Sequence, residues 1–167
     1  AVDLCVDYLN NIYVASNSNI KKYSPVGLLI WQRSLIAETL DYSKIDSTVI
    51  AAGYYTNILT LGNFSITSLG ASTDIYAAKL TLDNIPIWLV NVTNDPTHEY
   101  SMKSCIIEQS GHLYIGSSFT NPQWGDYFSI MDISVSGMAS FSGIILSQAM
   151  YYIPCRSMSG KDSLLSF

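Results

Sequence analysis

Charged side chains are scarce in this chain, and those present have no strong basic grouping. Asp, Glu, Lys and Arg make up 13% of the 167 residues, and the formal net charge is −5. The largest basic cluster is Lys21-Lys22. A protein that follows a phosphate backbone needs a basic stripe, so we expect no nucleic-acid partner. Apolar runs such as Gly27 to Trp31 are too short to cross a bilayer, so we also expect no membrane span.

Residues that usually carry catalysis or bind metal are also few. The three cysteines are Cys5, Cys105 and Cys155, and the two histidines are His98 and His112. No C-x-x-C or G-x-S-x-G pattern frames any of them, and the carboxylates are scattered, so we predict no metal, cofactor or catalytic residue. The cysteine separations of 100 and 50 place the thiols at similar repeat positions on different sheets. A disulfide is the alternative, but equivalent strands of different sheets point sideways and not at each other, so we favour buried core thiols.

What is abundant favours strands. Hydrophobic residues make up 49% of the chain, 12 residues are Tyr, and polar turn formers are plentiful. This mixture suits β-strands joined by polar turns better than helices. The length fits one domain with a sizeable core. The composition therefore predicts an all-β fold.

Three stretches repeat one short pattern, in which an alternating apolar run leads to a small turn residue and then to an aromatic residue four places later. The pairs are Gly27 with Trp31, Asn84 with Trp88, and Gly137 with Phe141. The turn residues lie 57 and 53 positions apart (84−27 and 137−84). A repeat of this length built of short strands is typical of β-propeller blades, and we assign the aromatic residues to packing between blades.

Each unit resolves into four short strands, the number found in a propeller blade. The units cover residues 1–36, 37–93 and 94–147, and a fourth begins at 148–167. The predicted strands are Val2–Asp7, Ile12–Ser16, Ile20–Ser24 and Leu28–Leu35; Thr39–Ser43, Val49–Tyr54, Ile75–Leu82 and Ile87–Val92; and Ser104–Glu108, Leu113–Ser118, Phe128–Val135 and Phe141–Leu146. The extra residues Tyr55–Thr73 form either an added hairpin or long extensions of two strands.

Three units and a partial fourth are too few for a closed ring, which typically takes about four to eight blades. Either the chain is a piece of a longer protein, which we favour, or several copies complete one another. An open array also leaves unpaired strands at its edges, and these invite association. The expected partners are therefore other protein chains or the missing blades.

Several segments resemble the SBBP-type β-propeller repeats. They are Asn11–Ser16, Ile20–Trp31 (IKKYSPVGLLIW), Asp74–Leu80 (DIYAAKL) and Gly111–Ser117 (GHLYIGS). The third unit departs from the pattern, with Met131 and Asp132 in place of Lys-Tyr and Phe141 in place of Trp. The resemblance implies a propeller in a secreted, cell-surface or virion-associated protein, without fixed catalytic residues.

A non-catalytic structural or recognition module is the function that these patterns favour. The alternative is a carbohydrate-binding module, in which loop aromatics stack on sugar rings, and the candidates are Trp124, Tyr54 and Tyr55. The interpretation that we favour for these aromatics is that they cover the edge of their own blade. An enzyme with a site at the mouth of a complete ring is a third alternative. Asn63 and Asn91 begin N-glycosylation sequons, and Asn63 is the better candidate because it lies in the inserted segment.

Overall fold

The computed structural model describes residues 2–68, 73–92, 99–107, 113–121, 125–133 and 139–146, and for most residues after 98 it describes the backbone alone. Within these ranges every regular element is a strand, and all the strand pairings are antiparallel. The predicted all-β class is therefore confirmed. In the same ranges there is no helix of the length and hydrophobicity needed to cross a membrane.

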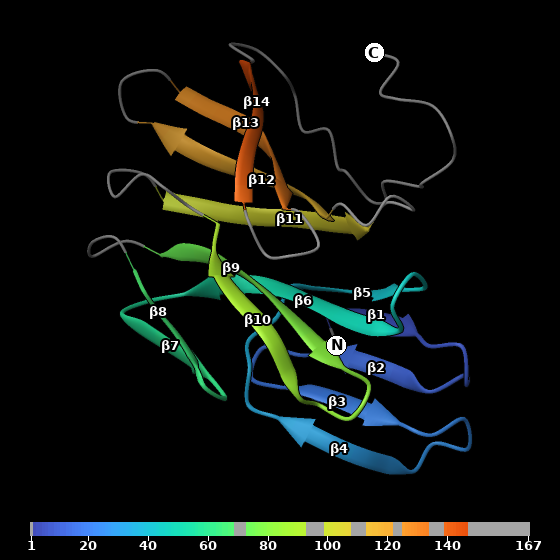
Figure 1. Cartoon of the computed structure of the whole chain (residues 1–167). Helices are drawn as coiled ribbons and strands as arrows, with labels where there is room; N and C mark the ends of the chain where they lie inside the picture. Colours follow the sequence, from blue (N-terminus) through green and yellow to red (C-terminus); the bar gives the residue numbers. More distant parts are fainter. Residues whose placement is uncertain are drawn as a thin grey trace.

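The strands form three sheets of four strands and one small hairpin, which Figure 1 labels along the chain. The first sheet has the order β1-β2-β3-β4, with strands Asp3–Val6, Ile12–Ala15, Ile20–Tyr23 and Leu29–Arg33. The middle sheet has the order β10-β9-β6-β5, with β5 at Thr39–Ser43, β6 at Thr48–Tyr55, β9 at Asp74–Thr81 and β10 at Pro86–Asn91. The third sheet has the order β11-β12-β13-β14, with strands Glu99–Ile107, Leu113–Asn121, Gly125–Ile133 and Ala139–Leu146.

The extra residues of the second predicted unit form an added hairpin. Strands β7 (Ile58–Leu61) and β8 (Phe64–Thr67) pair with each other and lie between β6 and β9 in the sequence. Of the two alternatives, the separate hairpin is the one observed. The strands of the first and middle sheets lie within two residues of their predicted bounds, and β5, which the sequence marked poorly, lies at Thr39–Ser43. The third sheet differs more: β11 begins at Glu99 rather than Ser104, β12 ends at Asn121 rather than Ser118, and β13 begins at Gly125 rather than Phe128.

The first and middle sheets share one turn geometry. In the turn between β3 and β4, Gly27 has φ +84° and its N–H donates to the Ser24 carbonyl at 2.9 Å. In the turn between β9 and β10, Asn84 has φ +68° and its N–H donates to the Thr81 carbonyl at 3.0 Å. Gly and Asn are the residues that adopt this left-handed conformation at least cost. Both are therefore turn residues, as predicted, whereas Gly137 lies outside the described residues.

The aromatic residue after each turn pairs with the strand before it. Trp31 lies opposite Lys22 and Trp88 lies opposite Lys79, and each pair adjoins a register shift. In the third sheet the backbone of Phe141 pairs with that of Met131, next to a register shift between Ile130 and Met131. The first two sheets thus share a cross-strand lysine–tryptophan pair that the third sheet lacks.

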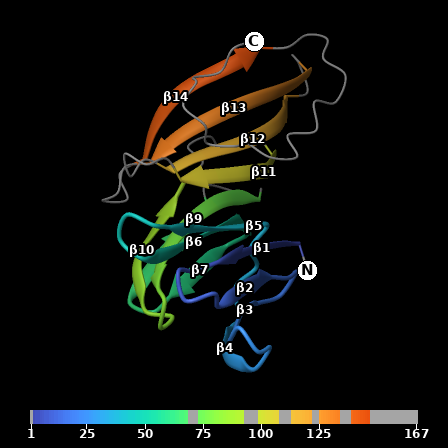
Figure 2. The same cartoon turned by 90° about the vertical axis from the view of Figure 1, so that its right-hand side faces the viewer.

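The three sheets are stacked, with the middle sheet between the other two (Figures 1 and 2). Successive side chains of a strand point to opposite faces, and in the middle sheet both sets are buried. Those toward the first sheet are Val49, Ala51, Tyr55, Tyr76, Ala78, Leu80 and Leu89, and they share a core with Cys5, Tyr13, Ala15 and Ile20. Those toward the third sheet are Ile50, Ala52, Ile75, Ala77 and Trp88, and they share a core with Leu113, Ile115 and Ile133.

One glycine of the middle sheet marks a close approach of the backbone. A Cβ atom added to Gly53 would lie 2.5 Å from the Ile36 carbonyl oxygen and 3.1 Å from the Ala37 Cα. Ile36 and Ala37 belong to the connection that leads from the first sheet into the middle sheet. Only a residue without a side chain lets this connection cross so close to β6.

Candidate functional site

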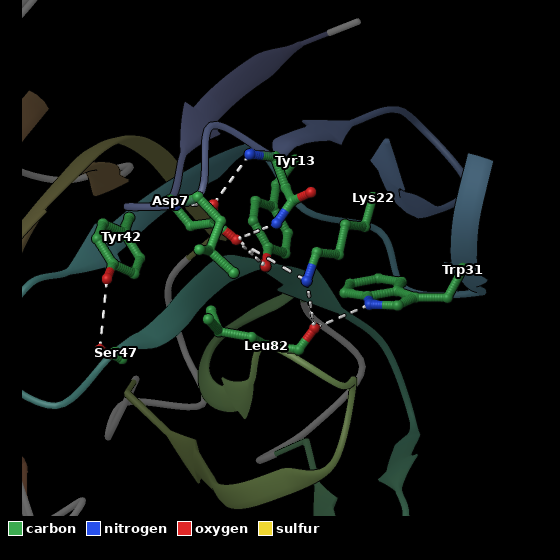
Figure 3. A network of polar contacts seen from close by, with 9 residues as sticks. Asp7, Tyr13, Lys22, Trp31, Tyr42, Ser47 and Leu82 are labelled. Carbon is green, nitrogen blue, oxygen red and sulfur yellow. Dashed lines mark hydrogen bonds and ion pairs between the residues drawn. The ribbon is translucent and has the colours of Figure 1, made fainter. Parts of the chain in front are cut away.

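A network of polar side chains joins the first and middle sheets, and we call it the polar junction. Lys22 and Trp31 lie side by side on β3 and β4 and point toward the turn after β9 (Figure 3). The Lys22 ammonium and the Trp31 indole N–H each donate to the carbonyl oxygen of Leu82, both at 3.0 Å. Two donors from one sheet thus share a single acceptor on the next.

A third donor reaches the same turn. Arg33 follows Trp31 on the same face of β4; its Nε donates to the Asn84 side-chain oxygen and its Nη2 donates to the Asn84 carbonyl at 2.7 Å. Asn84 is also the residue of this turn with a left-handed backbone, so the Arg33 guanidinium hydrogen-bonds to the residue that has the least favourable backbone conformation. Three side chains of the first sheet therefore grip one turn of the middle sheet.

Asp7 anchors the opposite side of Lys22. Its carboxylate is buried and accepts hydrogen bonds from the backbone N–H groups of Leu9 and Asn11, from the Asn11 amide and from the Tyr13 hydroxyl, at 2.9 to 3.0 Å. The Lys22 ammonium lies 3.8 Å from Asp7 Oδ2. Burial raises the pKa of Asp7, but the hydrogen bonds from Asn11, Tyr13 and Leu9 outweigh burial, so the pKa is lowered overall.

The aromatic rings complete the packing of this junction. Tyr13 and Trp31 meet edge to face with their ring centroids 5.8 Å apart, and the Lys22 ammonium lies 5.2 Å from the centre of the Tyr13 ring. Burial, followed by the hydrogen bond to Asp7, raises the pKa of the Tyr13 hydroxyl far above its ordinary value. The Asp7 carboxylate and the Tyr13 hydroxyl are thus held by packing and by hydrogen bonds to each other and to their neighbours. In this arrangement they stabilise the contact between the two sheets.

A shallow hollow of about 520 Å³ lies beside this junction and opens widely to solvent. Its lining residues are Val6, Asp7, Tyr8, Tyr42, Lys44 and Ser47. The Tyr42 hydroxyl donates to Ser47 Oγ at 3.4 Å, and the Asp7 carboxylate is already engaged in the network described above. The hollow is open rather than enclosed, so it lacks the form of a typical ligand site.

The predicted stacking pair Tyr54 and Tyr55 does not form one platform. They are neighbours at the end of β6, so they point to opposite faces of the sheet. Tyr54 is 40% exposed, whereas Tyr55 is 6% exposed and packs edge to face on Tyr76 at 6.4 Å between centroids. Tyr55 is therefore a core residue in this structure, and only Tyr54 presents a ring to solvent. Trp124 lies outside the described residues.

The two sequon asparagines differ in their surroundings. Asn63 is exposed in the turn of the β7–β8 hairpin. Asn91 is half-buried at the end of β10, and its amide donates to Asp74 at 3.4 Å. Asn63 therefore remains the better candidate for glycosylation, which stays a prediction.

The remaining predicted residues divide into those that the structure places and those that it does not. Trp31 packs against the core between the first and middle sheets, Trp88 lies in the core between the middle and third sheets, and Cys5 is a buried thiol. The side chain of Phe141 lies outside the described part, as do those of Cys105, Cys155, His98 and His112.

Sequence reasoning overlooked Lys22 and Arg33, which bond to the middle sheet, and Asp7, which lies beside Lys22 within the first sheet. A signal was available, because a lysine stands five positions before the turn residue in both sheets: Lys22 before Gly27, and Lys79 before Asn84. Both lysines are 6% exposed. Lys79 forms an ion pair with Asp46, so the equivalent position in the middle sheet also holds a paired, buried cation. A lysine that repeats on the apolar face of a strand indicates such a buried partner.

No group of three or more His, Cys, Asp or Glu side chains within the described ranges is placed to hold a metal ion. A scan against protein-family models and a search of curated proteins find no match to this chain.

Proposed function

We propose that this chain is a non-catalytic structural module of propeller type, in which successive four-stranded sheets act as blades and join protein chains at a surface or on a particle. The observation that carries the proposal is that the two interfaces between sheets use equivalent positions. Val49 and Leu80 of the middle sheet are fully buried toward the first sheet, and Leu113 and Ile133 of the third are 0 to 3% exposed toward the middle sheet.

The strand register supports the same reading. Val49 lies opposite Leu80, and Leu113 lies opposite Ile133. Leu80 and Ile133 are each the fourth residue before the predicted turn residues Asn84 and Gly137. Each sheet thus uses the same pair of positions to contact the sheet that precedes it in the sequence. Repeat proteins build a continuous core in this way.

The polar junction supports a structural role as well. Lys22, Trp31 and Arg33 all donate from the first sheet to the turn of the middle sheet, and these contacts fix how one sheet sits on the next. Buried hydrogen-bonded groups of this kind specify one geometry, because displacement by a few ångströms leaves several of them unsatisfied. A fixed angle between successive sheets is the property that a radial array requires.

Electron microscopy of the protein, together with the intact mass of the native polypeptide, tests the proposal. We expect particles in which four-stranded sheets are arranged around an axis, either in one longer chain or in several copies. Particles with sheets in any other arrangement would contradict the propeller type. A glycan-array signal that a Tyr54→Ala variant abolishes would instead support the carbohydrate-binding alternative.

A further inference from the structure

The first sheet has an apolar face that no other described sheet covers. Along β1 and β2, Leu4 lies opposite Val14 and Val6 lies opposite Ile12. Along β3 and β4, Tyr23 lies opposite Leu29. Because neighbouring residues of a strand alternate, these six side chains share the face that points away from the middle sheet, and we call it the outer face.

Several apolar side chains of the outer face are exposed to solvent. Leu4 is 58% exposed, Val6 44% and Leu29 54%. Its polar members, Lys21 and Gln32, pair with each other at the β3–β4 side of the sheet. Contiguous apolar surface of this kind marks an interaction site in a folded protein.

The other two sheets show what this face is built to contact. Ile12 and Tyr23 stand opposite each other in the first sheet, as Val49 and Leu80 do in the middle sheet. Val49 and Leu80 are fully buried by the preceding sheet, whereas Ile12 and Tyr23 are half-buried. The same positions are thus covered by a sheet wherever a preceding sheet exists.

The opposite end of the stack has the complementary opening. The third sheet contacts the middle sheet through β11, which approaches β5, β6 and β9. On its other side no described sheet is stacked (Figures 1 and 2). Among the described strands, the first sheet therefore has no sheet stacked on its outer face, and the third sheet has none stacked on its far side.

We propose that the outer face of the first sheet docks a second copy of this chain, whose third sheet stacks on it as the first sheet stacks on the middle one. This inference rests on the proposed function and names its partner. The contact joins two different surfaces, so it is a head-to-tail contact that forms rings when the rotation closes and filaments when it does not.

Sedimentation velocity of the purified chain from about 1 to 100 μM tests this inference, because that range covers contacts of ordinary affinity. We expect the 18.4 kDa chain to associate with rising concentration, into a dimer if two copies close a ring and into larger species if they do not. The variant Leu4→Lys/Leu29→Lys places two charges in the contact and should weaken association about tenfold or more. Both side chains are more than half exposed, so the fold should tolerate the change.

The matched control is Ile58→Lys, which adds a charge at a 65% exposed residue of the β7–β8 hairpin, away from the outer face. It should associate like the unchanged chain. The inference would be overturned if the unchanged chain stayed monomeric throughout the range. It would also be overturned if the double variant associated as strongly as the Ile58→Lys control.

The outcomes separate this inference from the proposed function. Particles with sheets arranged around an axis, combined with undiminished association of the double variant, would leave the structural module standing and remove this docking face. Association that is lost in the double variant, in particles without a radial array, would do the reverse. Far-UV circular dichroism of both variants checks that each retains the strands of the unchanged chain.

Discussion

The indole N–H of Trp31 donates to the carbonyl oxygen of Leu82 at 3.0 Å, across 51 positions of sequence. The bond joins a strand of one sheet to a turn of the next, so it forms only when the two sheets are stacked in one particular way. Lys22 donates to the same oxygen. Because the Leu82 carbonyl accepts from two donors, it keeps a hydrogen bond to the first sheet when either donor is removed.

Removing either donor alone should cost little, and removing both should cost more than the sum. Trp31→Phe keeps an aromatic ring but loses the N–H, and Lys22→Met keeps the aliphatic stem but loses the ammonium. Each single variant should lose about 1 kcal/mol of unfolding free energy, whereas the double variant leaves the Leu82 carbonyl without either donor and should lose about 1 kcal/mol more than the sum. Urea denaturation of all four proteins measures this coupling; strict additivity would contradict the shared acceptor.

The buried carboxylate of Asp7 should make stability depend on acid. Its folded-state pKa is lowered, so the unfolded state binds a proton more readily. The stabilisation is complete above the unfolded pKa of about 3.9 and is lost as the pH falls through the folded pKa. Asp7→Asn should therefore destabilise the protein by about 1 to 3 kcal/mol at neutral pH, and the difference from the unchanged chain should shrink below about pH 4.

Urea titrations at several pH values measure this difference. Asp83→Asn is the control, because Asp83 is an exposed carboxylate in the β9–β10 turn and the change removes the same charge. A difference for Asp7→Asn that stays constant from pH 7 to about pH 2 would show that the carboxylate charge does not stabilise the network.

Gly53 should tolerate no side chain. A methyl group there meets the Ile36 carbonyl oxygen at 2.5 Å and the Ala37 Cα at 3.1 Å, and both atoms belong to the backbone. Gly53→Ala should cost about 2 to 4 kcal/mol, because the connection between the sheets has to move. Gly27→Ala is the comparison: nothing lies within 4 Å of its Cβ, so only the strain of φ +84° remains, at about 1 to 2 kcal/mol. Thermal denaturation ranks the two, and the reverse order would refute the crowding at Gly53.

Tyr55→Phe should preserve or increase stability at neutral pH. The Tyr55 hydroxyl is buried and has no hydrogen-bond partner among the described residues, so its removal eliminates a desolvated polar group. Burial, followed by the charge of Asp74, raises the pKa of Tyr55 to about 12. Because the folded state holds this proton longer than the unfolded state, the unchanged chain loses stability as the pH rises from the unfolded pKa of about 10 through the folded pKa of about 12.

Alkaline unfolding followed by circular dichroism provides the measurement. Between about pH 10 and 12 the unchanged chain should lose more stability than Tyr55→Phe. Tyr54→Phe is the matched control, since Tyr54 is the exposed neighbour on the same strand. Equal alkaline losses in the unchanged chain and both variants would exclude a contribution from Tyr55 ionisation.

Local features of this fold could be predicted from the sequence, because they depend on neighbouring residues. Alternation of apolar side chains placed the strands, and Gly27 and Asn84 marked turns that need a left-handed backbone. The packing role assigned to Trp31 and Trp88 follows from the same pattern. Each ring does contribute to a core between two sheets.

Contacts between sheets could not be predicted in this way. The acceptor of Trp31 is a backbone carbonyl whose position depends on the stacking of two sheets, and a carbonyl carries no sequence signal. The same limit explains Tyr55: its burial follows from the first sheet covering the middle one, whereas a short segment of sequence shows only that Tyr54 and Tyr55 face opposite ways. The propeller arrangement itself remains a proposal for the same reason.

The middle sheet has no side that faces water, and this sets a condition on biosynthesis. Ala51 and Ala78 need the first sheet above them, while Ala52 and Ala77 need the third sheet below. A ribosome delivers the first sheet early, but the second covering comes only after about fifty further residues have emerged, at roughly 5 to 20 residues per second. During those seconds the nascent chain exposes one apolar face of the middle sheet to solvent. We expect a chaperone to bind the chain in this interval.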